Sequence, residues 1–111
     1  KAFADIDFIR LPKEGPDEFF NYQSYSIYLK ENCPVSRNDL MQLLLDRKIA
    51  TRRGVMTTHR ETAYKEYCGG LSLPISEDAQ DRSIIIPLFV PMSAEEIQTV
   101  ITNFRECLGY K

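Results

Sequence analysis

The sequence predicts one α/β domain of the α+β kind, an antiparallel or mixed sheet of about three to four strands with helices packed on it. Its elements follow the order strand, helix, strand, loop, short helix, strand, helix, with one strongly amphipathic helix at each side. The chain has 111 residues and 43% hydrophobic residues, which is enough for one core and too little for two.

The expected helix at the carboxyl end begins after Ser93. The run S-A-E-E fits a capping box, in which the serine hydroxyl and the Glu96 carboxylate bind amides of the first turn. Gly109 is placed to end this helix in a left-handed conformation. Apolar side chains recur behind the cap with helical spacing, at Ile97, Val100, Ile101, Phe104 and Leu108.

Two more helices are expected. One begins at Ser36, with Asp39 favouring its positive amino end. A third, shorter helix is expected over residues 74–82, capped by Ser76. The first of these two should bury Leu40, Leu43 and Leu44, with Met41 and Leu45 widening the apolar stripe.

Strands are expected between the helices. Residues 22–29 alternate apolar and polar side chains, and residues 5–11 form a shorter edge strand ended by Pro12. Residues 49–53 begin a further extended segment. The β-branched run at 84–86 suits a strand that is buried on both faces.

The domain organisation follows from these elements. Residues 1–20 are expected to supply the amino-terminal edge strand and a surface connection, and residues 21–111 a single compact domain. The segment 57–70 has the weakest pattern, and its Gly69–Gly70 pair indicates a turn. Because the chain opens inside a strand pattern, we expect it to be cut from a longer protein.

Composition excludes several classes of function. Fourteen basic and sixteen acidic side chains give a net charge of −2, which offers no basic field for nucleic acid or an anionic membrane. The longest apolar stretch, 84–92, is far too short to span a bilayer. Cys33, Cys68 and Cys107 lack metal-ligand spacing, so we expect no metal site and a reduced, cytoplasmic protein.

One loop carries an arrangement that suits anions. The segment 51–64, T-R-R-G-V-M-T-T-H-R-E-T-A-Y, holds Arg52, Arg53, Arg60 and the single histidine, His59. Guanidinium groups match carboxylate and phosphate oxygens, and Gly54 would let the backbone approach a ligand closely. The alternative is a solvated loop whose arginines pair with nearby acids, namely Glu61, Glu66 or Asp46. The acidic run at 77–81 is expected to lie on an exposed helix face.

Three stretches resemble the carboxy-terminal small domain of the DegT/StrS-type sugar aminotransferases. They are N-Y-Q-S-Y-S-I-Y-L at 21–29, the segment S-R-N-D-L through H-R-E-T-A-Y at 36–64, and L-P-I-S-E through Q-T-V-I at 73–101. The sequence departs from the family pattern at several positions. Lys48 stands where the family commonly has glycine, Thr57 and Thr58 replace a common Pro-Leu, and Ile86 replaces leucine.

The resemblance implies a parent enzyme that depends on pyridoxal phosphate (PLP) and has the aspartate aminotransferase fold. Such an enzyme moves an amino group from an amino acid, usually glutamate, to a keto-sugar nucleotide in polysaccharide or antibiotic-sugar biosynthesis. The lysine that binds the cofactor belongs to the family's large domain, and no lysine of this chain lies in a matching stretch. We therefore expect no catalytic residue and no bound cofactor in this chain, and a homodimeric cytoplasmic parent.

The resemblance also implies substrate-binding residues in this chain. By position in the motif these are Arg53 and His59 first, then Arg52, which would hold a donor carboxylate or a nucleotide phosphate. The alternative to an aminotransferase small domain is a free-standing domain that binds a small anion or another protein. An exposed apolar patch is expected for an interaction domain and for an excised small domain alike.

Overall fold

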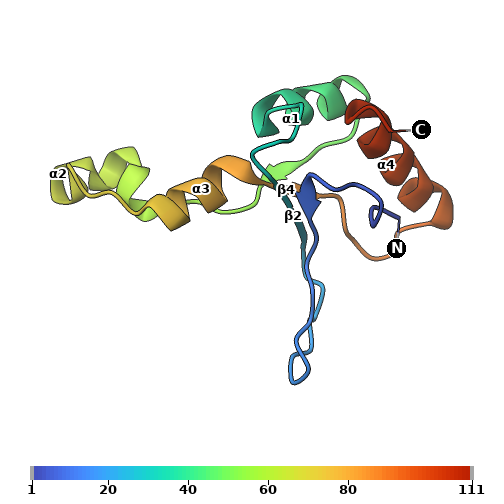
Figure 1. The fold of residues 1–111 in the computed structure, drawn as a ribbon, viewed down its shortest axis with the longest axis horizontal. Helices are drawn as coiled ribbons and strands as arrows, with labels where there is room; N and C mark the ends of the chain where they lie inside the picture. Colours follow the sequence, from blue (N-terminus) through green and yellow to red (C-terminus); the bar gives the residue numbers. More distant parts are fainter. Residues whose placement is uncertain (1, 111) are drawn as a thin grey trace.

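The computed structural model describes residues 2–110 and contains one four-stranded antiparallel sheet (Figure 1). Its strands are β1 (Ile9–Arg10), β2 (Tyr25–Leu29), β3 (Arg52–Arg53) and β4 (Ser83–Ile86), in the spatial order β1-β2-β4-β3. β4 therefore lies inside the sheet, as its β-branched run predicts, and β1 and β3 form the edges. The predicted fold class is confirmed.

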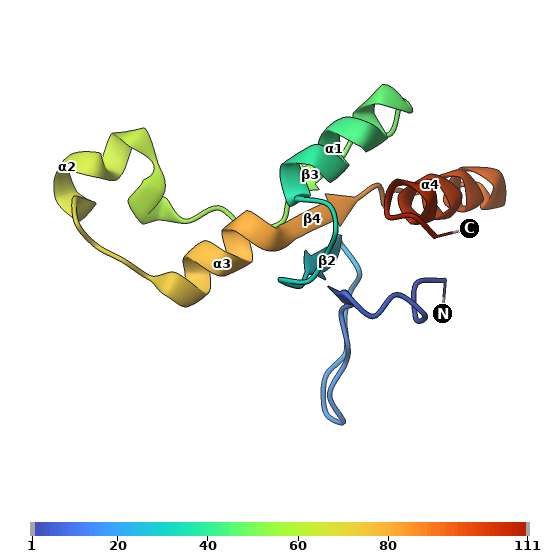
Figure 2. The same cartoon turned by 45° about the horizontal axis from the view of Figure 1, so that its top comes forward.

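Four α-helices accompany the sheet, with bounds α1 (Arg37–Asp46), α2 (Lys65–Cys68), α3 (Pro74–Arg82) and α4 (Ala94–Cys107). Two 3-10 turns, η1 (Thr58–Arg60) and η2 (Thr62–Tyr64), precede α2. Figures 1 and 2 show α1 and α4 beside the sheet, whereas α3 and α2 extend away from it. None of the helices in residues 2–110 combines the length and apolar character that a membrane span requires.

The core lies between the sheet and helices α1 and α4. Alternate residues of a strand point to one face of the sheet, so the inward side chains of β2 and β4 meet those of the two helices. Phe104 of α4 is completely buried and packs against Phe3, with the two rings tilted by 54° and their centroids 5.0 Å apart. The strand and helix residues that fill this core are Ile27, Leu29, Ile84, Ile86, Leu40, Leu44, Val100 and Phe104.

Local signals in the sequence set the ends of α4 and α1. The expected capping box is present, since Ser93 Oγ accepts from the Glu96 N–H and the Glu96 carboxylate from the Ser93 N–H. Gly109 follows α4 with a φ of 82°, as expected. Lys48 follows α1 with a φ of 63°, in the left-handed region that favours glycine. Glycine would adopt this backbone conformation at a lower steric cost than lysine does.

Two expectations about helices are wrong. Ser76 does not cap α3; Leu73 is the cap residue, and Glu77 Oε1 accepts from its N–H at 2.7 Å. Leu43 and Leu45 are exposed, because only the narrow face of α1 that carries Leu40 and Leu44 meets the core. A broad apolar stripe in the sequence overstates the buried face when a helix lies over the edge of a small sheet.

Two segments project from the sheet and core. One is the connection between β1 and β2, residues 11–24, and the other is an arm that we define as residues 55–82 (Figure 1). The radius of gyration is 15.5 Å, above the roughly 13 Å typical of a compact chain of this length. Within the arm only Thr57 and Gln80 are buried, while large apolar side chains are exposed at Val55, Met56, Tyr64, Tyr67, Leu71, Leu73 and Ile75.

The predicted edge strand is shorter than expected. Only Ile9–Arg10 pairs with β2, since residues 2–5 form turns instead. Phe3, Ile6 and Ile9 nevertheless reach the core, and Asp5 makes a two-pronged ion pair with Arg105 of α4. These contacts attach the amino-terminal segment to the carboxyl-terminal helix, which brings both ends of the described chain together (Figure 2).

Candidate functional site

The two adjacent arginines of β3 lie on the open edge of the sheet. Arg52 is opposite Ile85 of β4 and Arg53 is opposite Ile84. Both side chains are exposed, and within residues 2–110 neither has a carboxylate within 4.0 Å. Successive strand residues point to opposite faces, so the two guanidinium groups serve different surfaces of the domain.

Arg52 lines an open groove of about 540 Å³ at the end of the sheet. The groove is bounded by the start of β2, by the segment that leads into β3 and by the segment that follows β4. Its wall combines polar groups with an exposed apolar surface, at Gln23, Ser24, Thr51, Arg52, Leu88 and Phe89. A groove with one unpaired cation and an apolar wall suits an anionic ligand that also carries a ring or a hydrocarbon part.

Gly54 brings the backbone close to the sheet rather than to a ligand. Its N–H donates to the Ser83 carbonyl at 3.1 Å. A Cβ at this position would lie 2.4 Å from Ser83 Cβ and 2.9 Å from Ser26 Oγ. The glycine was expected to let the backbone approach a ligand, but in the structure it lets the backbone approach the sheet. The segment that follows Arg53 can therefore pass close to β2 and β4.

His59 lies in the arm and is held by α3. Its Nε2 is 2.9 Å from Glu77 Oε1, and the side chain is only 6% exposed. The neighbouring Arg60 binds the other oxygen of Glu77 at 3.1 Å and Asp81 at 2.8 Å. The N–H of Leu73, the His59 ring and Arg60 together hold the pKa of Glu77 below its usual value.

These contacts correct two expectations about the loop. The alternative interpretation paired its arginines with Glu61, Glu66 or Asp46, but Arg60 pairs with Glu77 and Asp81 on α3. The acidic run of α3 thus supplies ion-pair partners, and Asp81 at its end is exposed as expected.

A second set of contacts fastens α3 to the sheet. The Tyr28 hydroxyl donates to Asp78 Oδ2 at 2.5 Å, and Arg82 donates to Asp78 Oδ1 at 2.8 Å. The Tyr28 hydroxyl, followed by Arg82, lowers the pKa of Asp78, whereas Asp78 raises that of Tyr28. The Thr57 N–H and hydroxyl also donate to the buried Gln80 side chain, which ties the start of the arm to α3. The position of His59 is therefore determined by the sheet through α3.

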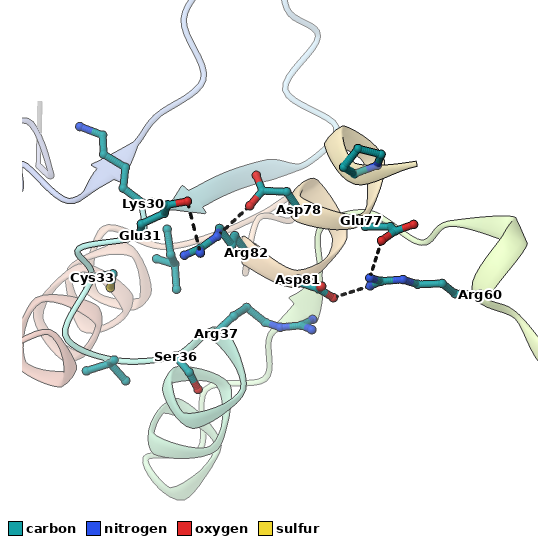
Figure 3. A pocket seen from close by; sticks show the side chains of 13 residues that line it. Lys30, Glu31, Cys33, Ser36, Arg37, Arg60, Glu77, Asp78, Asp81 and Arg82 are labelled. Carbon is teal, nitrogen blue, oxygen red and sulfur yellow. Dashed lines mark hydrogen bonds and ion pairs between the residues drawn. The ribbon is translucent and has the colours of Figure 1, made fainter. Parts of the chain in front are cut away.

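Arg37 is a cation that the sequence analysis did not select. It is the first residue of α1, it is 9% exposed, and its Nε and Nη1 are buried without a hydrogen-bond partner. It lines a cavity of about 560 Å³ between the start of α1 and α3 (Figure 3). A signal was present in the sequence, because a basic residue directly after a helix cap opposes the helix dipole.

The structure does not bring the three predicted substrate-binding residues together in one site. Arg52 faces the open groove, Arg53 lies near Arg37, and His59 is held by Glu77 in the arm. Within residues 2–110 no cluster of three metal-ligating side chains occurs. Two of the three predicted residues, Arg52 and Arg53, are thus exposed cations that an anionic group can reach.

Known aminotransferases share this fold. TlmJ, an aminotransferase from Streptoalloteichus hindustanus, superposes with a TM-score of 0.82 and 25% identity, over 97% of this chain and 28% of that protein. The PLP form of Spr1654 from Streptococcus pneumoniae, described as a sugar aminotransferase, gives a TM-score of 0.78 at 22% identity, over 97% of this chain and 28% of that one. The fold is therefore one that occurs within aminotransferases, over about a quarter of their length.

The sequence narrows this class. Residues 1–105 match the profile of the DegT/DnrJ/EryC1/StrS aminotransferase family, and the chain belongs to this family. The dTDP-4-dehydro-2,3,6-trideoxy-D-glucose 4-aminotransferase of Saccharopolyspora spinosa is 27% identical over 110 residues, which is 99% of this chain and 27% of that enzyme. The chain thus spans about a quarter of the length of the curated relative that it matches.

No lysine in residues 2–110 is placed to form an imine with PLP. A lysine that forms an imine with this cofactor must approach it in an enclosed pocket. All four described lysines, Lys13, Lys30, Lys48 and Lys65, are exposed. Lys30 Nζ donates to the Asp7 carbonyl instead. No step that involves the cofactor can therefore be assigned to this part of the chain.

Proposed function

We propose that this chain is the small domain of a PLP-dependent enzyme that transfers an amino group from an amino acid, glutamate in our proposal, to a keto-sugar nucleotide. Residues 21–111 would form the domain, and residues 1–20 its edge strand and connection. Family membership over residues 1–105 supports the proposal, as does the sugar-nucleotide substrate in the name of the Saccharopolyspora relative. The Spr1654 structures in the PLP form and in the pyridoxamine phosphate (PMP) form support the proposal that PLP is the cofactor.

The contribution of this chain would be to bind the anionic part of a substrate. The observation that carries this proposal is the pair Arg52 and Arg53, which are adjacent in the sequence, exposed, and without an acidic partner among residues 2–110. Most other arginines of the domain are already neutralised by ion pairs, namely Arg47, Arg60, Arg82 and Arg105. Guanidinium groups left without a carboxylate are suited to a donor carboxylate or a nucleotide phosphate.

His59 would take part as a positioned side chain. Glu77 occupies Nε2 and fixes the ring, which leaves Nδ1 as the nitrogen that can meet a substrate. Because α3 fixes Glu77, the ring would keep its orientation when a ligand arrives. We propose that each of these residues contacts a substrate in its own surroundings, with His59 in the arm and with Arg52 and Arg53 on opposite faces of β3.

Three further parts of the proposal concern the parent protein. It would be a cytoplasmic homodimer of a nucleotide-sugar pathway, and the imine-forming lysine would come from a large domain outside this chain. The isolated 111-residue chain would be inactive. The exposed apolar side chains of the arm support such a division, since contact with further protein would remove them from water.

The test of substrate binding uses the complete polypeptide that carries this chain. Arg53→Ala and Arg52→Ala should each raise KM for the donor or for the sugar nucleotide by roughly 10- to 100-fold, because a hydrogen bond to a charged group is worth about 1.5–3 kcal/mol. Arg10→Ala is the matched control, since Arg10 lies over the Tyr28 ring rather than on the β3 edge. Unchanged kinetics for both substrates in both variants would refute the assignment.

The reaction class needs a separate measurement. We expect the complete polypeptide with added PLP to show the absorption band of a lysine imine and to lose this band when glutamate is added. The 111-residue chain with added PLP should show no such band. A folded complete polypeptide without the band would refute the aminotransferase proposal. The free-standing anion-binding domain would then be the better account of Arg52 and Arg53.

A further inference from the structure

Arg37 is a buried charge for which residues 2–110 supply no counter-ion in contact. Its side chain runs from the start of α1 into the cavity toward Asp81 and Arg60 (Figure 3). Nε and Nη1 are buried without a partner, and within residues 2–110 no carboxylate lies within 4.0 Å of the guanidinium. Buried polar groups in native proteins are almost always satisfied, so this one requires an explanation.

The surroundings of Arg37 oppose its charge in three ways. Burial lowers the pKa of the guanidinium most, and the nearby Arg53 lowers it further, while only Asp81 acts in the opposite direction. The amino end of α1 adds positive potential, because its free amides point in the same direction. A guanidinium remains protonated even so, which makes the site strongly attractive to an anion.

The acidic residues of the same cavity cannot neutralise Arg37, because each is engaged elsewhere. Asp81 binds Arg60 at 2.8 Å, and Glu77 is shared by Arg60 and His59. Asp78 is held by Tyr28 and Arg82, and Glu31 lies 3.9 Å from Arg82. Among residues 2–110, therefore, no free carboxylate in this cavity is left to balance the charge of Arg37 and Arg53.

We propose that Arg37, flanked by Arg53, binds a carboxylate that enters the cavity between the start of α1 and α3. A planar carboxylate matches the guanidinium fork and carries one charge. A phosphate dianion would meet repulsion from the four acidic side chains that line this cavity, Glu31, Glu77, Asp78 and Asp81. The inference goes beyond the proposed reaction and does not depend on it, since the unpaired guanidinium stands whether or not the parent binds PLP.

The carboxylate can come from a small molecule or from an acidic side chain of the polypeptide outside this chain, and one set of variants separates these sources. The experiment measures Tm of the complete polypeptide for wild type, Arg37→Met, Arg37→Lys and the control Arg10→Met. Methionine keeps the aliphatic stem of Arg37 and removes its charge. Each protein is measured with added sodium acetate, sodium phosphate or sodium chloride at equal ionic strength.

Two results would support the proposal. A rise in Tm with acetate, seen in wild type and Arg10→Met and lost in Arg37→Met, would identify a free carboxylate ligand. A lower Tm for Arg37→Met that Arg37→Lys does not restore, without any acetate effect, would identify a carboxylate of the polypeptide, because breaking a buried pair destabilises.

Two results would overturn it. An Arg37→Met protein at least as stable as wild type, with no Arg37-dependent effect of acetate, would show that the charge has no counter-ion, since removing an uncompensated buried charge stabilises. A rise in Tm with phosphate that exceeds the rise with acetate and depends on Arg37 would show that the site takes a different anion. An imine band in the complete polypeptide is independent of all four results, so this inference and the proposed reaction can fail separately.

Discussion

Replacing Gly54 by alanine tests how the domain positions Arg53. The new Cβ would lie 2.4 Å from Ser83 Cβ, 3.2 Å from the Ser83 carbonyl carbon and 2.9 Å from Ser26 Oγ. Carbon atoms in contact stay about 3.5–4.0 Å apart, so the backbone of residue 54 must move by roughly an ångström. Ser83 is buried in the middle strand and cannot move away easily. We expect the β3 end to separate from β4.

The cost of this displacement follows from overpacking in other proteins, about 1–3 kcal/mol. The free energy of unfolding of a chain of this size falls by about 2 kcal/mol per molar urea, so the urea concentration at the midpoint of unfolding should fall by roughly 0.5–1.5 M. Equilibrium unfolding of the 111-residue chain in urea measures the change directly.

Gly15→Ala provides the matched control. There the added Cβ would meet only the flexible side chain of Glu18, at 3.1 Å. Equal midpoints for Gly54→Ala and Gly15→Ala would show that the backbone does not cross β4 as closely as described. The steric account of why Arg53 holds its position would then be wrong.

Three further perturbations have defined outcomes. Lys48→Gly should raise the free energy of unfolding by roughly 0.5–1 kcal/mol, because glycine adopts the left-handed conformation after a helix at a lower cost. Urea unfolding measures this change, and a loss of stability would contradict the account. Asp5 has a pKa lowered to about 2 from 3.8, so its ion pair with α4 stabilises the fold above pH 3.8 and is lost as the pH falls toward 2. The plot of Tm against pH should be flatter in that interval for Asp5→Asn, and an unchanged slope would exclude the contribution. Glu77→Gln should accelerate amide hydrogen exchange in the 3-10 turn around His59, because it removes a partner of that ring. The control Glu66→Gln, on the exposed surface of α2, should not. Equal exchange rates in both variants would show that the ion pairs do not hold the turn.

Local signals allowed the ends of α4 to be predicted. The S-A-E-E cap and Gly109 act within a few residues of themselves, so the sequence alone contains the necessary information. The cap of α3 was mispredicted for a related reason. Both Ser76 and Glu77 can accept from backbone amides near a helix start, and the choice of Glu77 depends on contacts with His59 and Arg60 in another segment.

The candidate site could be predicted only in part. The residue types of the loop indicate an affinity for anions, but the partners of its cations lie 17 to 21 residues away in the chain, on α3. Sequence spacing therefore could not show that Arg60 is neutralised while Arg53 is not. The burial of Arg37 is likewise set by the packing of α1 beside β4 and α3, which no local pattern contains.

The junction of α3 and β4 has a consequence for how this domain can vary in length. Arg82 ends the helix and Ser83 begins the strand, so no loop separates them (Figure 2). One residue inserted into α3 would turn everything beyond it by about 100° around the helix axis, and Glu77 would leave His59. An insertion in residues 11–24, which project into solvent, would be absorbed by the loop. Evolutionary insertions and deletions should therefore accumulate in that loop, and the distance along the chain from Glu77 to β4 should stay constant.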